Sequence, residues 1–100
     1  MTRVYKILPR QDWTEAQARG GYGGAPIDRA DGFIHLSAAD QVAETLRLHF
    51  AGQADLVIVG FEAEALGDAL RWEASRGGAL FPHLYGPLPV ALAVSVEDAA

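Results

Sequence analysis

The sequence contains no cysteine, and this absence removes several classes of site at once. Disulfides, thiolate metal sites, iron–sulfur clusters and cysteine nucleophiles all require a thiol. Positive charge is also scarce, because eight Lys and Arg residues stand against thirteen Asp and Glu residues, for a formal net charge of −5. Binding to a phosphate backbone needs clustered positive charge, so we expect no nucleic acid partner.

Long apolar runs are absent as well. No stretch approaches the roughly 20 apolar residues of a membrane-spanning helix, and residues 1–6 lack the apolar core of a secretory signal. We therefore expect a cytoplasmic protein without a membrane partner. The 100 residues, half of them apolar, suffice for one hydrophobic core and show no linker or repeat. A single domain over residues 1–100 is the expectation.

Short strand and helix patterns follow one another along the sequence. Asp12 and Ser37 are each typical of a helix N-cap, while Gly20 and Gly52 are typical helix stops, so we expect two main helices. Apolar patterns indicate strands at residues 4–8, 33–37, 56–59, 70–73 and 88–96. Four to six short strands in a mixed or split sheet, with only two main helices, predict a compact α+β domain.

Two segments combine an aromatic ring, a histidine and a hydroxyl at alternate positions. They are Phe33, His35 and Ser37 in the first segment and Phe81, His83 and Tyr85 in the second. Alternate residues of an extended segment share one face, so these side chains would suit a flat ligand with polar edges. The alternative is that both histidines are core or rim residues and that the rings only pack.

Three further residues are candidates for a ligand site. Glu73 is a candidate acid, base or ribose-binding carboxylate, and Arg71 is a candidate phosphate ligand. The alternative for both is an exposed surface position. Tyr22 lies in the glycine-rich segment 20–24, which we interpret either as a mobile lid with Tyr22 at its tip or as a plain connector. Metal-ligand spacing and phosphate-loop motifs are absent, so we expect no metal ion.

The histidine segments also carry a family resemblance. Residues 31–37 (DGFIHLS) followed by Gln41, residues 81–86 (FPHLYG) and the Trp72-Glu73 step resemble domain of unknown function family 952, a group of small bacterial proteins. The order of strands and helices is similar too, so the resemblance spans nearly the whole chain. It implies a fold like that of ADP-ribosyltransferases, which bind NAD in a cleft between two small sheets and transfer ADP-ribose.

The resemblance also implies roles for individual residues. His35 and Ser37 look like the histidine and the small hydroxyl residue of an early cleft strand, so His35 would contact the nicotinamide ribose and Ser37 would support it. Tyr85 and Glu73 are the residue types that stack on nicotinamide and polarise the ribose. NAD would then be a substrate.

Two other functions stay open. A non-catalytic module would hold a metabolite or peptide in the aromatic cleft. A two-histidine phosphoesterase would use His35 and His83 as general acid and base at a cyclic phosphate. His35-Leu36-Ser37 matches the motif of those enzymes, whereas His83-Leu84-Tyr85 departs from it. A carboxylate placed beside His35 and the ligand would favour chemistry, and a cleft without one would favour binding alone.

Overall fold

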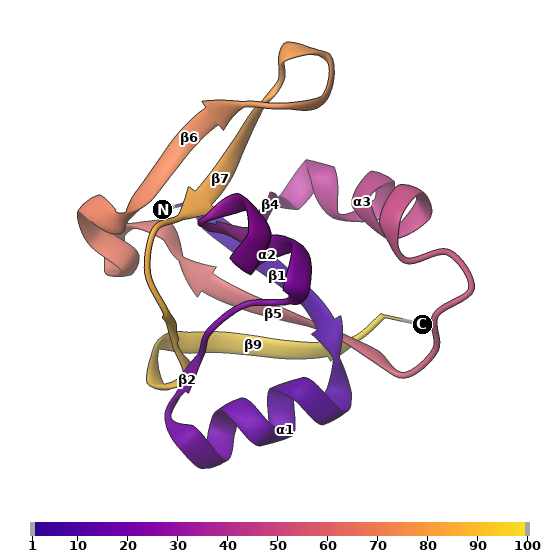
Figure 1. The fold of residues 1–100 in the computed structure, drawn as a ribbon, viewed down its shortest axis with the longest axis vertical. Helices are drawn as coiled ribbons and strands as arrows, with labels where there is room; N and C mark the ends of the chain where they lie inside the picture. The colour runs from indigo at the N-terminus through magenta and orange to yellow at the C-terminus, as the bar shows by residue number, and fades with distance from the viewer. Residues whose placement is uncertain (1, 100) are drawn as a thin grey trace.

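Three small antiparallel sheets and three α-helices organise the chain in the computed structural model, which describes residues 2–99 (Figure 1). The strands are β1 (Arg3–Pro9), β2 (Gly21–Tyr22), β3 (Ile34–His35), β4 (Ser37–Ala38), β5 (Leu56–Glu62), β6 (Leu70–Ala74), β7 (Leu80–Leu84), β8 (Leu88–Pro89) and β9 (Ala93–Asp98). The α-helices are α1 (Arg10–Arg19), α2 (Pro26–Asp31) and α3 (Val42–His49), and the short 3₁₀ helices are η1 (Ala39–Gln41), η2 (Ala63–Ala69), η3 (Arg76–Gly78) and η4 (Val90–Leu92). The α+β class predicted from the sequence is confirmed.

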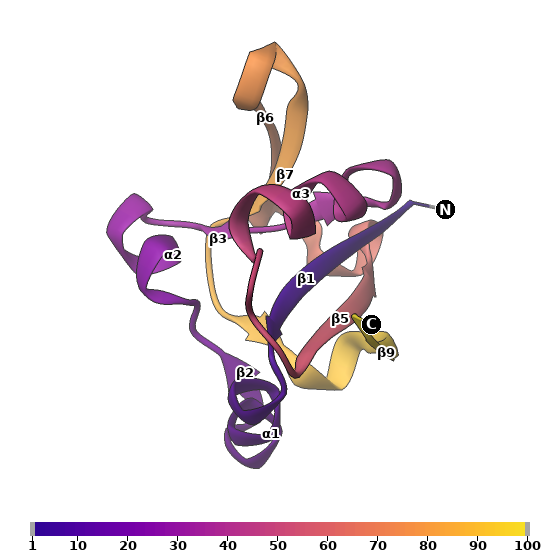
Figure 2. The same ribbon diagram turned by 90° about the vertical axis from the view of Figure 1, so that its right-hand side faces the viewer.

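The largest sheet, of order β4-β1-β5-β9, forms one wall of the core. Its central strands β1 and β5 pair along their whole length, from Arg3 opposite Glu62 to Pro9 opposite Leu56. Apolar side chains of these strands are fully buried, among them Val4, Leu8, Val57, Val59 and Phe61. A second sheet, β3-β7-β6, projects from this core as a hairpin at one end, while α1 and the β2-β8 pair lie at the other end (Figure 2).

The two expected helices exist, but they begin elsewhere than predicted. Helix α1 begins two residues before Asp12, because Pro9 in an extended conformation serves as the N-cap. It ends at Gly20, whose φ of 86° is the left-handed conformation that favours glycine. Helix α3 is shorter than expected and ends at His49, so the stop expected near Gly52 lies beyond the helix.

The predicted strand over residues 33–37 is wrong, because the chain changes sheets within it. Ile34 and His35 pair with β7, whereas Ser37 and Ala38 pair with β1. Ser37 is consequently buried in the large sheet, and its Oγ lies 3.2 Å from Thr45 Oγ1. The N-cap expected of Ser37 is wrong as well, since the Gln41 side chain accepts the hydrogen bond from the Ala38 N–H instead.

Two other segments differ from the prediction. The segment 20–24 contains strand β2, which pairs with β8, so Tyr22 is buried at 6% exposure and does not stand at the tip of a lid. The continuous strand expected over 88–96 is broken by the 3₁₀ helix η4 into β8 and β9. The described residues thus hold nine strands, four of only two residues, because brief pairings between sheets carry no sequence period.

Candidate functional site

The two histidines face each other across neighbouring strands. The β3-β7 ladder places His35 directly opposite His83, and their ring centroids lie 5.7 Å apart in an edge-on arrangement. On the other side of β7, the ladder with β6 places Arg71 opposite His83 and Glu73 opposite Phe81. The three-stranded sheet therefore brings both histidine segments and the Trp72-Glu73 step into one place.

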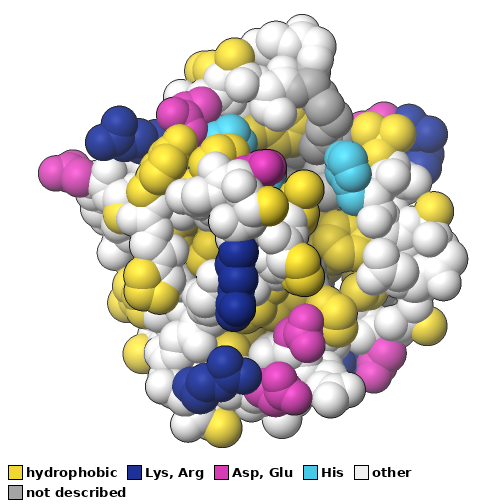
Figure 3. Space-filling view, viewed as in Figure 1, with side chains coloured by type: hydrophobic (Ala, Val, Ile, Leu, Met, Phe, Trp, Pro, Cys, Tyr) yellow, Lys and Arg dark blue, Asp and Glu magenta, His cyan; other side chains and the backbone are white. Residues whose placement is uncertain are grey.

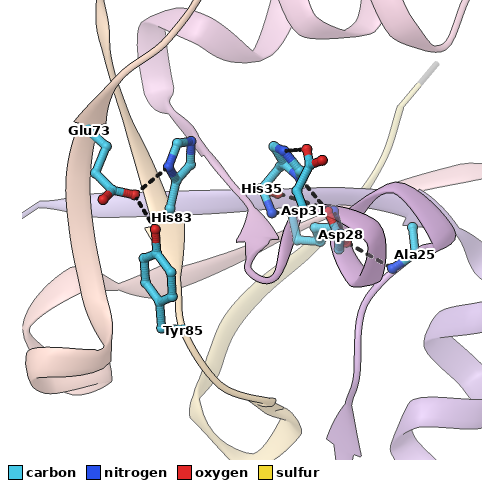
Figure 4. A network of polar contacts seen from close by, with 8 residues as sticks. Ala25, Asp28, Asp31, His35, Glu73, His83 and Tyr85 are labelled. Carbon is cyan, nitrogen blue, oxygen red and sulfur yellow. Dashed lines mark hydrogen bonds and ion pairs between the residues drawn. The ribbon is translucent and has the colours of Figure 1, made fainter.

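Glu73 is the hydrogen-bonding centre of the hairpin (Figure 4). Its Oε1 accepts a hydrogen bond of 2.7 Å from the Tyr85 hydroxyl and lies 2.8 Å from His83 Nδ1. The bonds from Tyr85 and His83 hold the pKa of Glu73 below its usual range, so this carboxylate is ionised near neutral pH. The same carboxylate raises the pKa of the Tyr85 hydroxyl and keeps it protonated as a donor.

A layer of rings covers this hydrogen-bonded group. The Phe33 ring stacks on His83 at 4.0 Å between centroids, and it also lies 5.3 Å from Tyr85 and 4.7 Å from His35. The Arg71 guanidinium lies 5.5 Å above the Tyr85 ring, within range of a cation–π contact. The His83 side chain is only 7% exposed, whereas those of Glu73 and His35 are 38% and 35% exposed, so the carboxylate and His35 form the open edge.

His35 is held by two carboxylates. Its Nδ1 lies 2.6 Å from Asp28 Oδ1, and its Nε2 lies 2.9 Å from Asp31 Oδ2. Ionised carboxylates only accept hydrogen bonds, so both contacts are satisfied when both ring nitrogens carry protons. Figure 4 shows the two histidines between Glu73 on one side and the two aspartates on the other.

Asp28 is buried beneath His35 and is fully hydrogen-bonded. It accepts bonds from Lys6 Nζ at 2.9 Å, from the Ala25 N–H at 2.8 Å, and from the backbone and ring nitrogens of His35. Lys6 Nζ also donates to the His35 carbonyl at 3.1 Å. Burial opposes ionisation of Asp28, but the Lys6 ammonium and the bonds from His35 together hold its pKa below the usual range. This buried ion pair fixes both the backbone and the ring of His35.

The sequence reasoning missed Lys6, Asp28 and Asp31. One signal for Lys6 was available, because it stands in the apolar segment 4–8, where a buried lysine requires an anionic partner. Nothing in the sequence indicates which residue is that partner, since Asp28 lies 22 residues away on a short helix that was not predicted.

The structure brings together most of the predicted site residues, but not all of them. The three-stranded sheet brings six of them together: Phe33, His35, Arg71, Glu73, His83 and Tyr85. Phe81 is buried on β7 two positions before His83. Ser37 lies in the large sheet and so away from the expected shared face, and Tyr22 lies in the β2-β8 pair.

Within residues 2–99, no three His, Asp or Glu side chains gather in the manner of a metal site. In the same residues, every helix is too short or too polar to cross a membrane.

Comparison with known proteins gave matches of two kinds. The model of the family described as protein of unknown function (DUF952) matches residues 7–96. The crystal structure of protein CC0527 from Caulobacter crescentus is 55% identical, with a TM-score of 0.94 over 97% of this chain and 85% of that chain. The solution NMR structure of CC0527 gives a TM-score of 0.87 over 98% and 84% of the two chains. No curated protein matches the chain.

Proposed function

The chain belongs to the DUF952 family of proteins of unknown function, and we propose that it is a small cytoplasmic enzyme that binds NAD, or a related nucleotide, and transfers ADP-ribose. The observation that carries this proposal is the Glu73 carboxylate, which bonds both His83 and Tyr85 at the edge of the ring layer. A positioned and ionised carboxylate beside an imidazole is a feature of chemistry rather than of simple ligand capture. The likeness to the ADP-ribosyltransferase fold is part of the same proposal.

The reaction needs stabilisation of positive charge at the ribose. The bond between C1′ and the nicotinamide nitrogen breaks, and its electron pair leaves with nicotinamide. Positive charge then develops on the ribose, and the ionised Glu73 is suited to stabilise it electrostatically. The acceptor nucleophile forms the new bond to C1′ and gives up its proton. Within the described residues His83 Nε2 has no hydrogen-bond partner, so it can take that proton while Nδ1 faces Glu73.

The remaining side chains suit the rest of the ligand. Phe33 offers an aromatic face for a flat base, and Arg71 offers a guanidinium for a phosphate group. Stacking of nicotinamide on Tyr85 would displace the Arg71 side chain, which occupies one face of that ring and is exposed. His35 would meet a ribose hydroxyl through Nε2, in exchange for its contact with the exposed Asp31.

The two-histidine phosphoesterase is less well supported. That mechanism needs one imidazole as a base and a second as an acid, each with a ring nitrogen directed at the phosphate. Both nitrogens of His35 already contact aspartates, and Ser37 lies in a different sheet. The one motif that matches that class of enzyme in sequence therefore lacks its hydroxyl beside the histidine.

The test combines a binding measurement with a chemical one. NAD is titrated against ¹⁵N-labelled protein, and nicotinamide release is followed by chromatography. We expect amide shifts at His35 and His83 and nicotinamide release that is lost in Glu73→Gln. The control Glu64→Gln removes the same charge at an exposed position outside the site and should retain release. Shifts without release would support the binding module instead, and no shift at millimolar NAD would refute the proposed NAD-dependent transfer.

A further inference from the structure

A hollow lies outside the histidine site, next to a buried hydroxyl that has no hydrogen-bond partner among the described residues. This Tyr22 hollow has a volume of about 150 Å³ and is bounded by Tyr22, Arg29 and the α1 side chains Asp12, Glu15 and Arg19. Tyr22 is 6% exposed, and its hydroxyl has no hydrogen-bond partner within residues 2–99. A buried polar atom left unpaired is destabilising, so such an atom calls for an explanation.

Another hollow lies beside Phe33 and shares two lining residues with the Tyr22 hollow. This Phe33 hollow, of about 170 Å³, is bounded by Phe33, Gly32, Gly86, Gly23 and Arg29, the last two of which also line the Tyr22 hollow. Because Phe33 stacks on His83, the two hollows lead from the ring layer toward α1. Figure 3 shows basic and acidic side chains gathered on this face, over α1, β2 and α2.

Arg29 stands at the junction without a fixed partner. It is exposed, and within the described part of the chain its guanidinium forms no ion pair, in contrast to Arg19, which pairs with Glu15. A Cβ atom at Gly23 would lie 3.5 Å from Arg29 Nη2, so the missing side chain leaves the backbone beside the guanidinium open. An arginine fork beside exposed glycine backbone is suited to a phosphate group.

The other groups of the Tyr22 hollow suit hydroxyls. Burial raises the pKa of the Tyr22 hydroxyl, which therefore stays protonated and acts as a donor. The carboxylates of Asp12 and Glu15 accept hydrogen bonds from hydroxyl groups. Each hollow is large enough for a pentose or a phosphate group, but not for a whole nucleotide.

We propose that the two hollows form one groove that binds a sugar phosphate, with the phosphate on Arg29 and the sugar hydroxyls in the Tyr22 hollow. The Tyr22 hydroxyl then donates to the ligand, which accounts for its lack of a partner within the described residues. The inference rests on the proposed function in one respect. If the chain binds a nucleotide that contains ADP-ribose, this groove would hold the part of that nucleotide that extends away from His83.

The probes are ribose 5-phosphate alone and ADP-ribose, each titrated against ¹⁵N-labelled protein. We expect shifts at the amides of Gly21, Gly23 and Gly24 with both probes. Arg29→Gln should weaken binding of ribose 5-phosphate about tenfold, through loss of a charge-assisted bond. Arg47→Gln makes the same charge change on α3, where Arg47 pairs with Glu44, and should alter the affinity by less than about twofold.

Tyr22→Phe separates a binding role from a packing role. It should weaken ribose 5-phosphate binding about fivefold or more, while the midpoint of urea unfolding stays the same or rises, because only an unpaired hydroxyl is removed. Unchanged affinity in both Tyr22→Phe and Arg29→Gln would overturn the groove.

The pattern of shifts separates the groove from the proposed function. With ADP-ribose, shifts at the three glycines without shifts at His83 would keep the groove and reject the proposed function. Shifts at His83 alone, with ADP-ribose, would do the reverse. No shift with either probe would reject both.

Discussion

At the scale of single residues, Asp28 connects stability to the site. Its carboxylate is 1% exposed and accepts four hydrogen bonds, two of them from His35. It is also the counter-ion of Lys6, whose ammonium is almost as deeply buried. Removing one partner of such a pair leaves the other as an uncompensated buried charge.

The first prediction follows from this pair. Asp28→Asn should lower the free energy of unfolding by about 3–5 kcal/mol, because Lys6 stays buried without its counter-ion. Urea unfolding measures the change. The matched control is Asp31→Asn, which removes the other aspartate contact of His35 at an exposed position and should lower the free energy by less than about 1 kcal/mol. Equal losses in the two variants would contradict the role assigned to the Lys6–Asp28 pair.

The second prediction concerns the proton on His83. With Glu73 as acceptor, the neutral ring should carry its proton on Nδ1, which ring ¹⁵N NMR detects directly. Glu73→Gln should populate both neutral tautomers of the His83 ring, since an amide can either donate or accept a hydrogen bond. Tyr85→Phe removes only the other bond to Glu73 and should leave the Nδ1–H form dominant. An unchanged His83 spectrum in Glu73→Gln would show that Glu73 does not orient the ring.

At the scale of elements, strand β5 depends on a glycine at its centre. Gly60 lies opposite Tyr5 on one side and Ser95 on the other, at the bulge in the β5-β9 ladder. A Cβ atom there would collide with Ser95 Oγ and would lie 3.1 Å from the Tyr5 ring. A side chain at this position would therefore require the Ser95 hydroxyl and the Tyr5 ring to move.

The third prediction tests this close approach. Gly60→Ala should lower the free energy of unfolding by about 1–3 kcal/mol, as in other overpacked sites. Adding Ser95→Ala removes the nearest atom and should recover part of that loss. Thermal and urea unfolding of the single and double variants measure the coupling between the two positions. Additive losses would mean that the collision with Ser95 is not the cause.

Helices and strands could be predicted from the sequence where each is long enough to show a regular spacing of apolar residues. The apolar run 56–59 became the buried strand β5, and Gly20 ended α1 as expected. Ser37 was misplaced because alternation cannot reveal that the chain leaves one sheet for another after His35. Helix α2 was missed for a similar reason, since six residues are too few to display a helical period.

The candidate site was predicted in its residue types rather than in its contacts. Both histidine segments and Glu73 stood out by composition, and the structure places them together. The pairing of Lys6 with Asp28 could not be foreseen, because only the tertiary fold brings β1 under α2. The glycine neighbours of Tyr22 are typical of a lid or a connector, whereas pairing with β8 buries Tyr22.

At the scale of the whole molecule, the fourth prediction concerns acid. The pKa of Asp28 is lower in the folded chain than in the unfolded chain, where it lies near 4, so the folded state binds that proton less readily. The resulting stability is fully present above about pH 5 and is lost as the pH falls through the folded pKa. The urea midpoint should therefore drop steeply below about pH 4, and the drop should be shallower in Asp28→Asn. Parallel pH profiles of the two proteins would contradict this assignment.

The β6-β7 hairpin carries one part of the site, and the segment around β3 carries the other part. Glu73, His83 and Tyr85 all belong to this one hairpin, while Phe33 and His35 come from the segment around β3, which pairs with β7 at only two positions. The bonds among Glu73, His83 and Tyr85 therefore form within one hairpin, whereas the position of His35 beside them depends on β3 and on the bonds from His35 to Asp28. The site is thus assembled from two separately anchored parts, one local in the sequence and one set by the tertiary fold.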